Sequence, residues 1–407
     1  MGYRAQAISI NASRAVYALN WFNIAPGLQY ISRDLDLSLV QLGIMTTAFY
    51  IGLSTFQLVG GLLASRIGNR ATSSLGITIL GAAVIATGLS QNLPDLFLSR
   101  LFAGIGSAMF FSPALGMISE IVPQDKYSFH VGLFNGSFNL GGGVGIIGWD
   151  FLDQAFSWRT PLFLSGGIMI ALAVENYIIL RGAKTSTFGA RVFSRAGEVL
   201  RSRLIWILPI AALSGILSET VIGQLFVYYA ETGLHMSPNV ASVLGTTYLL
   251  IGFVGGMLGG YIFGRIRKRI LMFLAWALMV GAFTAVIWMT SNFILLFLLL
   301  LLLGILTVNV LSMLYTLTAE ATKDRGMVSF ALSFVILVFK GSLTTHLLQN
   351  LGYVWKAFCQ HHLGRHHGFR PHIDEVGFTS AGQQLCHITY VRVEIVCLIN
   401  LGGSICS

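Results

Sequence analysis

Long apolar runs of about 20 residues follow one another through residues 1–339, and only short loops separate them. A helix needs roughly 20 apolar residues to cross the ~30 Å hydrocarbon core of a bilayer. Only helices and closed barrels satisfy their backbone polar groups there. The chain is 55% hydrophobic and 10% charged, whereas soluble proteins average about 25% charged residues. These features predict an all-α membrane protein.

The apolar runs fall into two series, separated by a polar, basic segment at 182–203. We expect about 11 transmembrane helices, arranged as 6 + about 5. The predicted spans are 10–32, 39–64, 72–91, 94–119, 128–149, 161–181, 204–230, 240–264, 270–290, 292–318 and 327–339. The expected domains are therefore a first bundle at 1–181, a cytoplasmic linker at 182–203 and an incomplete second bundle at 204–339.

The loops alternate in charge. One set carries most of the basic residues, including Arg66, Arg70, Lys126, Arg181, Arg265, Arg267, Lys268, Arg269, Lys323 and Arg325. The opposite set carries Arg33 and Arg159. Because Lys and Arg are enriched in cytoplasmic loops, we expect the first set and the N-terminus to be cytoplasmic in a multi-pass protein of the plasma membrane.

The residues after 339 differ from the rest. All four cysteines lie there, and His361, His362, His366 and His367 form two adjacent pairs. Their spacing matches no standard zinc pattern, so no metal site is expected, although a metal-binding tail is an alternative. We interpret 340–407 as an atypical tail, produced by a frameshift or fusion, and expect the twelfth span to be missing or degenerate.

A weak internal repeat relates the two series of spans. Residues 61–70 read GLLASRIGNR, and residues 260–269 read GYIFGRIRKR. At one constant offset Gly61 aligns with Gly260, Arg66 with Arg265 and Arg70 with Arg269. Both copies follow the second span of their half, which indicates duplicated architecture.

The loop after the second span resembles the signature motif of the major facilitator superfamily. Its residues here are Gly61, Ser65, Arg66, Gly68 and Arg70. Ser65 departs from the Asp that is usual in the family, where the carboxylate helps latch the two halves on the cytoplasmic side. The repeat copy, with Gly260, Arg265 and Arg269, is expected to belong to the same gating machinery.

Two further motifs support the resemblance: Arg100-x-x-x-Gly104-x-Gly106 in the fourth span and Trp158-Arg159 before the sixth. The resemblance implies two six-helix bundles with a solute site between them near the bilayer midplane. It also implies transport by rocking of one bundle against the other, with the first, fourth, seventh and tenth spans lining the cavity.

Charged side chains inside the spans are Arg14, Arg100, Glu175 and Glu219. Each costs at least ~2.5–3.5 kcal/mol at the bilayer centre, so none is expected to face lipid. Arg14 either binds an anionic solute or extends to the cytoplasmic headgroups. Arg100 either takes part in binding and coupling or holds neighbouring carbonyls. Glu175, in the peripheral sixth span, is expected to be structural.

Glu219 lies near the middle of the seventh span and aligns with Asn20 at the repeat offset. The two are therefore expected to face each other across the cavity, and Asn20, like Tyr17, is a candidate pathway residue. Because burial disfavours the charged form of a carboxylate, Glu219 can exchange a proton, or it is a neutral group that bonds two helices. Tyr17 shares a helix face with Arg14. Asn309 and Tyr315 of the tenth span are candidate pathway groups or helix–helix contacts.

Glycines repeat every four residues in the eighth span: Gly252, Gly256, Gly260 and Gly264. This is the small-xxx-small pattern of close helix contacts in membranes. The fifth span is also glycine-rich, with Gly136, Gly141 and Gly145. We expect the two spans to pack closely, with a possible hinge role.

The sequence contains no phosphate-binding loop and no catalytic set in its membrane region, so we expect neither an enzyme nor a cofactor. The favoured function is proton-coupled secondary transport of a small solute, preferably an organic or inorganic anion. A proton-coupled exporter of drugs or cations and a non-transporting sensor or transporter remnant are alternatives. The expected partners are the solute, a coupling proton and membrane lipid, with no nucleic acid; the oligomeric state stays open.

Overall fold

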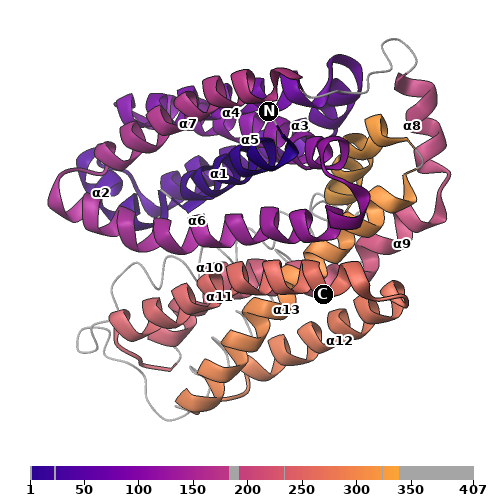
Figure 1. Ribbon diagram of the computed structural model, residues 1–407. Helices are drawn as coiled ribbons and strands as arrows, with labels where there is room; N and C mark the ends of the chain where they lie inside the picture. Colours follow the sequence, from indigo (N-terminus) through magenta and orange to yellow (C-terminus); the bar gives the residue numbers. More distant parts are fainter. Residues whose placement is uncertain (1, 23, 183–191, 233, 323, 339–407) are drawn as a thin grey trace, which may run out of the picture. The chain divides into compact units, whose positions relative to one another are not determined.

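The computed structural model describes residues 2–22, 24–182, 192–232, 234–322 and 324–338, and nearly all of them are helical (Figure 1). The described residues all belong to one compact unit. The atypical tail at 340–407, and with it the expectation that the twelfth span is missing or degenerate, lies outside the described residues.

Six helical segments match the first series of predicted spans. The first span is divided into α1 (Tyr3–Phe22) and α2 (Ile24–Asp34); the others are α3 (Leu39–Ile67), α4 (Asn69–Leu89), α5 (Leu93–Ile121), α6 (Tyr127–Ala155) and α7 (Arg159–Ile179). Because α1 begins seven residues before the predicted span, Arg14 lies about three turns inside the helix, not one turn from its end as expected.

The second series begins after α8 (Val192–Leu200), a short helix within the predicted linker. The next span is divided into α9 (Arg203–Ala211) and α10 (Leu213–Thr232), with Pro209 in the last turn before the break. A proline has no amide hydrogen and disturbs the preceding turn. The remaining helices are α11 (Pro238–Arg265), α12 (Arg269–Ile287), α13 (Phe293–Ala321) and an apolar helix at Arg325–Val338.

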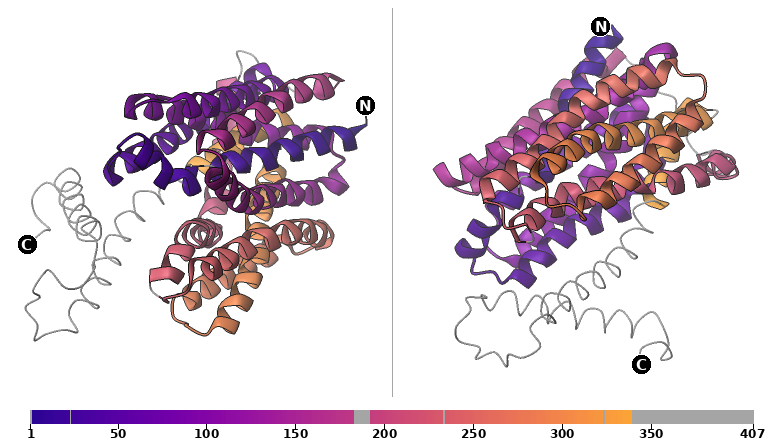
Figure 2. Two further views of the ribbon diagram at one scale, coloured as in Figure 1. Left: turned by 90° about the vertical axis from the view of Figure 1, so that its left-hand side faces the viewer. Right: turned by 90° about the horizontal axis from the view of Figure 1, so that it is seen from below.

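Seven helices among the described residues are long and apolar enough to cross a membrane. They are Gln41–Ile67, Asn69–Leu89, Leu93–Ile121, Arg159–Gly182, Val243–Arg265, Arg269–Ile287 and Phe293–Ala321. Helices α1 to α7 lie together, and α10 to α13 lie together beside them, with α6 running along α11 (Figures 1 and 2).

The contact between α6 and α11 is made by glycine. A Cβ atom on Gly256 would lie 2.5 Å from the carbonyl oxygen of Gly132, and one on Gly260 would lie 2.5 Å from that of Ser128. Such distances leave no room for any side chain. Gly252 packs against Asn139 of α6, whereas a Cβ on Gly264 would make only an ordinary 3.7 Å contact with Ser128. In lipid, where helices gain little from hydrophobic burial, close packing of this kind drives association.

The glycines of the Arg100-x-x-x-Gly104-x-Gly106 motif in α5 also allow helix backbones to pack closely. A Cβ on Gly104 would overlap the carbonyl oxygen of Phe49 in α3, and one on Gly106 would lie 2.5 Å from the backbone nitrogen of Leu80 in α4. Positions two apart on a helix point in nearly opposite directions. The two glycines therefore let α5 lie against α3 and α4 at once.

Trp158 and Arg159 join three helix ends. Arg159 donates from Nη1 to the carbonyl oxygens of Gly88 and Ser90, both at 2.9 Å, and pairs through Nη2 with Asp34 at 2.9 Å. The Trp158 indole donates to the same Asp34 carboxylate at 3.1 Å. This cluster fixes the beginning of α7 to the ends of α2 and α4.

We predict that Gly256→Ala lowers the melting temperature of the purified protein, because overpacking typically costs about 1–3 kcal/mol. The matched control is Gly264→Ala, which adds the same methyl group on the same helix where 3.7 Å of space is available. Thermal unfolding in detergent or nanodiscs measures the difference. Equal melting temperatures for the two variants would contradict the packing described for α6 and α11.

Candidate functional site

Arg14 lies in an aromatic cage, which we define as the rings of Tyr17, Phe111, Phe134 and Phe138. The distances from its Cζ to the four ring centroids are 4.7, 4.4, 4.9 and 4.3 Å. Arg14 is 6% exposed, so the side chain is enclosed and does not extend to the end of the helix. The cage is built from α1, α5 and α6.

The cage gives this buried cation favourable surroundings. A guanidinium over an aromatic face gains about 0.5 to 2 kcal/mol per ring, and most when it is desolvated. Four such contacts are comparable with the cost of placing a charge in the membrane interior. The rings contact the faces of the guanidinium, but Nε and Nη1 of Arg14 have no hydrogen-bond partner among the described residues. These two donors are available to a ligand.

The cage continues into a larger aromatic cluster in the first bundle. Tyr17 packs against Trp21, with ring centroids 6.0 Å apart, and Trp21 packs edge-on against Phe49 at 5.2 Å. The Cζ atom of Arg100 lies 4.8 Å from the centroid of Phe49. A chain of three aromatic side chains therefore connects the surroundings of the two buried arginines.

The α5 motif explains the place of Arg100. Arg100 lies one turn before Gly104, on the side of α5 that Gly104 brings against the backbone of Phe49. The residue is 3% exposed, and its Nε and Nη1 have no hydrogen-bond partner within the described part of the chain. A purely structural arginine would be expected to hold neighbouring carbonyls with these donors.

The second bundle contributes Tyr315 and Glu219. Tyr315 of α13 packs edge-on against Phe111 of the cage, with ring centroids 5.6 Å apart. Glu219 of α10 lies within electrostatic range of Arg14, Tyr315 and Tyr248. The predicted groups Arg14, Tyr17, Glu219 and Tyr315 thus gather around one cage, although they come from segments far apart in the sequence.

A polar network beside Glu219 was not expected from the sequence. The Thr307 hydroxyl donates to Ser218 at 3.1 Å, and Tyr248 is buried next to both. Ser218 next to Glu219 and Thr307 in the tenth span are visible in the sequence, but Ser and Thr in apolar spans usually bond to their own helix, so the sequence did not indicate that they bond to each other. The cage phenylalanines were also missed. Phe134 and Phe138 are one turn apart, but aromatic residues are frequent throughout these spans.

Asn20 and Asn309 each donate a hydrogen bond to a backbone carbonyl of their own helix. Asn20 is fully buried and donates to the carbonyl oxygen of Val16 at 2.9 Å. Asn309 donates to the carbonyl oxygen of Ile305 at 2.8 Å. Its side chain fills the space next to Gly259 of α11 in which any larger residue at position 259 would place its own side chain. Asn309 therefore packs between α13 and α11, while its Oδ1 atom is buried without a hydrogen-bond partner among the described residues.

The loop motif contains one glycine, Gly68, that its backbone conformation requires. Gly68 has φ of 97°, a conformation that disfavours other residues, and it ends α3 and begins α4. Its amide donates to Ala64 at 2.8 Å. Arg70 donates to the carbonyl of Arg181 and lies over the ring of Tyr177, whereas Arg66 is exposed. The loop thus fixes the adjacent ends of α4 and α7.

Ser65, the residue that departs from the family motif, connects the two halves. Its hydroxyl is fully buried and donates to the carbonyl oxygen of Gly326 at 2.9 Å. Next to it, the helix Arg325–Val338 packs closely against the first bundle: a Cβ on Gly61 would lie 2.6 Å from Ser333 Oγ, and Ser329 hydrogen-bonds to Asn69. A neutral hydrogen bond takes the place of the carboxylate latch.

The repeat copy makes a different contact. Arg269 pairs with Glu320 at the end of α13 and donates to the carbonyl of Gly264 at 3.3 Å. Arg265 is exposed and lies 3.4 Å over the ring of Tyr261. The two copies of the loop motif therefore fix helix ends in both halves. Each copy also contacts the other half: Ser65 of the first copy by a hydrogen bond to Gly326, and Gly260 of the second by close backbone packing against α6.

Helix α8 covers the contact between Ser65 and Gly326 described above. Ala196 of α8 forms a buried cluster with Met327 and Phe330, and Val199 and Leu200 pack beside it with Leu58 and Leu62 of α3. The linker predicted as a polar segment thus contains an apolar face that closes over α3 and the helix Arg325–Val338.

We predict that Ser65→Ala shifts the protein toward a state that is open at the Ser65–Gly326 contact, because the buried Gly326 carbonyl loses its donor at a cost of about 1–3 kcal/mol. The control is Ser333→Ala on the facing helix, whose hydroxyl has no hydrogen-bond partner among the described residues. Spin labels at the exposed positions Arg66 and Arg267, in a background without native cysteines, measure the opening. Identical distance distributions in the two variants would exclude the latch.

Within the described ranges, no group of three or more His, Cys, Asp or Glu residues is placed to hold a metal ion. The arrangement is suited to binding and moving a solute: two buried cations with free donors, aromatic walls and one carboxylate contributed by the other bundle.

The comparisons with known proteins agree with this architecture. The sequence profile of the Major Facilitator Superfamily matches residues 10–340. The chain is 24% identical over 279 residues to the quinolone resistance protein NorA of Staphylococcus aureus, covering 66% of this chain and 69% of that protein. It is 23% identical over 285 residues to the probable sphingolipid transporter spinster homolog 3 of Arabidopsis thaliana, covering 61% and 54%.

The fold is similar to crystal structures of the Escherichia coli fucose:proton symporter FucP. One of them superposes with a TM-score of 0.67 at 15% identity, covering 88% of this chain and 93% of that chain. A second, of FucP in the outward conformation, has a TM-score of 0.65 at 14% identity, covering 87% and 93%.

Proposed function

The chain belongs to the Major Facilitator Superfamily, and from this premise we propose that it is a proton-coupled secondary transporter of a small organic anion with an aromatic or otherwise apolar body. The observation that carries the proposal is Arg14, a buried cation whose faces are covered by four rings while Nε and Nη1 have no partner among the described residues.

The cage favours an organic over an inorganic anion. A small hydrated anion would have to lose its water next to the negative faces of aromatic rings, which do not replace that hydration. A carboxylate on an aromatic or aliphatic body can accept hydrogen bonds from Arg14 while its body packs against Phe111 and Phe138. Hydrogen bonds to charged groups contribute about 1.5–3 kcal/mol, enough to determine which solutes bind.

Glu219 provides the coupling to protons. When it is charged, it attracts Arg14 and repels an anionic solute in the same site. When it is protonated, both effects disappear and the anion binds more tightly. Proton binding and anion binding then favour each other by the same free energy, as linkage requires. The proton-coupled transport named for FucP is consistent with this role.

Alternating access follows from the division into a first bundle at 1–181, a linker at 182–203 and a second bundle at 204–339. The site lies where these bundles meet, because Phe111 belongs to the first and Tyr315 to the second. If one bundle rocks against the other about the glycine contact of α6 and α11, the distance between the rings of Phe111 and Tyr315 changes directly. The Ser65–Gly326 contact closes the side that the basic loops assign to the cytoplasm, and the N-terminus lies on that side of the plasma membrane.

We predict that Arg14→Met raises the KM for uptake of an aromatic carboxylate into proteoliposomes by about tenfold or more, because charge-assisted hydrogen bonds to the solute are lost. Methionine keeps an apolar stem within the cage. Arg14→Lys keeps the charge and is expected to lose less.

The control for this experiment is Arg66→Met, which removes an exposed arginine outside the cage. Uptake of the carboxylate by Arg14→Met with an unchanged KM would contradict the anion site, provided that the variant elutes as a folded monodisperse protein.

We predict that Glu219→Gln abolishes accumulation driven by a pH gradient but preserves exchange of labelled for unlabelled solute, because glutamine cannot release a proton. Glu175→Gln in α7 is the matched control and is expected to keep both activities. The measurements are solute accumulation with an imposed pH gradient and solute exchange without one. Gradient-driven accumulation by Glu219→Gln would assign proton coupling to another group.

Export of a cationic or lipophilic compound is the second candidate. The similarity to NorA, named for quinolone resistance, favours it, as does the carboxylate of Glu219 beside an aromatic site. In this case Glu219→Gln removes transport of a cationic dye, while Arg14→Met leaves it intact. The two variants therefore separate the two candidate substrate classes.

A further inference from the structure

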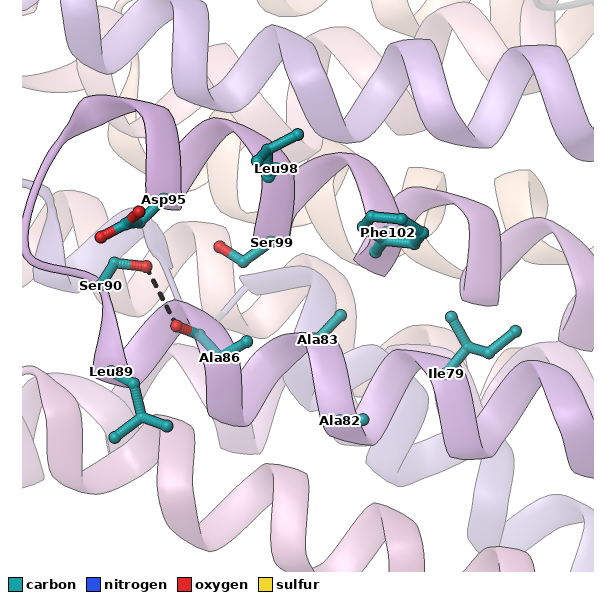
Figure 3. A pocket seen from close by; sticks show the side chains of 10 residues that line it. All are labelled: Ile79, Ala82, Ala83, Ala86, Leu89, Ser90, Asp95, Leu98, Ser99 and Phe102. Carbon is teal, nitrogen blue, oxygen red and sulfur yellow. Dashed lines mark hydrogen bonds between the residues drawn. The ribbon is translucent and has the colours of Figure 1, made fainter.

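A second concavity lies between α4 and α5, on residues separate from the aromatic cage (Figure 3). Its volume is about 560 Å³. Ten residues line it: Ile79, Ala82, Ala83, Ala86, Leu89, Ser90, Asp95, Leu98, Ser99 and Phe102. We call this concavity the α4–α5 groove.

The groove is present because the side chains of α4 along it are small. Deeper along the two helices, a Cβ on Gly76 would lie 2.6 Å from the backbone of Met109, so the helices touch there. Closer to the Ser90–Asn92 connection, α4 presents the small side chains of Ala82, Ala83 and Ala86. Phe102 and Leu98 of α5 form the opposite wall, and each is 53% exposed (Figure 3). Both walls therefore suit an apolar occupant.

Polar groups gather at one end of the groove. Ser90 donates its hydroxyl to the carbonyl of Ala86 at 3.0 Å, and Ser99 donates to that of Leu96 at 3.1 Å. Asp95 is exposed and is the single charge among the ten lining residues; its Oδ2 accepts from the backbone amide of Gln91 at 3.2 Å. A carboxylate in this position favours a cationic donor and repels an anion.

The length of the groove matches one leaflet of a membrane. From Ile79 to Leu89 the helix rises about 15 Å at 1.5 Å per residue, half of a hydrocarbon core roughly 30 Å thick. Asp95 lies at the helix ends, where lipid headgroups are found, and the apolar walls extend from there toward the bilayer centre. The occupant that fits this pattern has one charged end and an apolar chain one leaflet long.

We propose that the α4–α5 groove binds a phospholipid with a primary ammonium headgroup, its acyl chain lying between Ala86 and Phe102 and its ammonium group on the Asp95 carboxylate. A primary ammonium donates hydrogen bonds to a carboxylate. The methylated ammonium of phosphatidylcholine has no N–H to donate. An anionic headgroup would be repelled. The proposal concerns a lipid site and does not depend on which solute the protein transports.

The experiment is native mass spectrometry of the full chain, released from micelles that contain equal amounts of phosphatidylethanolamine and phosphatidylcholine with identical acyl chains. We expect the wild type to retain phosphatidylethanolamine about threefold over phosphatidylcholine, the preference that an exposed ion pair supports. Asp95→Asn is expected to remove this preference, and Asp95→Glu is expected to keep it.

A second pair of variants tests the groove itself. Ala86→Leu fills the groove from an exposed position and is expected to lower retention of both lipids. Ala171→Leu makes the same change at an exposed position of α7 and is expected to have no effect. Circular dichroism melting curves confirm that each variant is folded.

Three results would overturn the proposal: equal retention of the two lipids by the wild type, an undiminished preference in Asp95→Asn, or equal losses in Ala86→Leu and Ala171→Leu. Displacement of the retained lipid by a neutral apolar dye, without any dependence on headgroup, would also overturn it, since the groove would then hold lipophilic solutes.

Discussion

Helices α6 and α11 meet backbone to backbone, and this contact determines how the two bundles can be arranged. In water, burial of large apolar side chains would hold such helices together, but lipid offers no comparable gain. The glycines at Gly132, Gly256 and Gly260 instead allow close van der Waals packing over a long, smooth surface. At these glycines the two backbones touch directly, and further along the same contact Asn139 packs against Gly252 and Leu250 against Gly143.

Close helix packing at glycines also determines where the buried arginines lie. Gly104 brings α5 against α3, and the residue one turn earlier, Arg100, then lies over Phe49. Gly141 brings α6 against the backbone of Ala15 in α1, next to Arg14. The caged arginine therefore depends on a close approach of helices that larger side chains would prevent. Packing and electrostatics are linked in this way in the first bundle.

The contact between Ser65 and Gly326 shows how a departure from a family motif is accommodated. Ser65 supplies one neutral hydrogen bond to Gly326 where the usual residue would supply a charge. Neutral hydrogen bonds are about half as strong as charge-assisted ones. The apolar cluster of α8 with Met327 and Phe330 adds contact area at the same place. Closure of this side thus rests on packing together with a weak polar latch.

Much of the fold could be predicted from the sequence, because each span is a local property. The apolar runs gave helices whose ends agree with the structure to within a few residues in most cases, and the Gly252–Gly264 repeat indicated a close helix contact. The boundary of the first span was less accurate, because Gln6 and Ser9 are polar residues that α1 buries against α7. A polar residue buried between helices cannot be distinguished locally from a loop residue.

The site could be predicted only in part. An arginine or glutamate within an apolar run is visible in the sequence, so Arg14, Arg100 and Glu219 were identifiable. The sequence by itself determined that this chain is a set of membrane helices with few, costly internal charges, since length and hydropathy decide that residue by residue. Only the tertiary structure decided that four rings from three helices enclose Arg14, that Tyr315 and Glu219 approach it from the other bundle, and that Asn309 packs against Gly259. The physical reason is that a helix fixes the direction of its side chains, whereas the partner of each side chain depends on how closely two backbones approach.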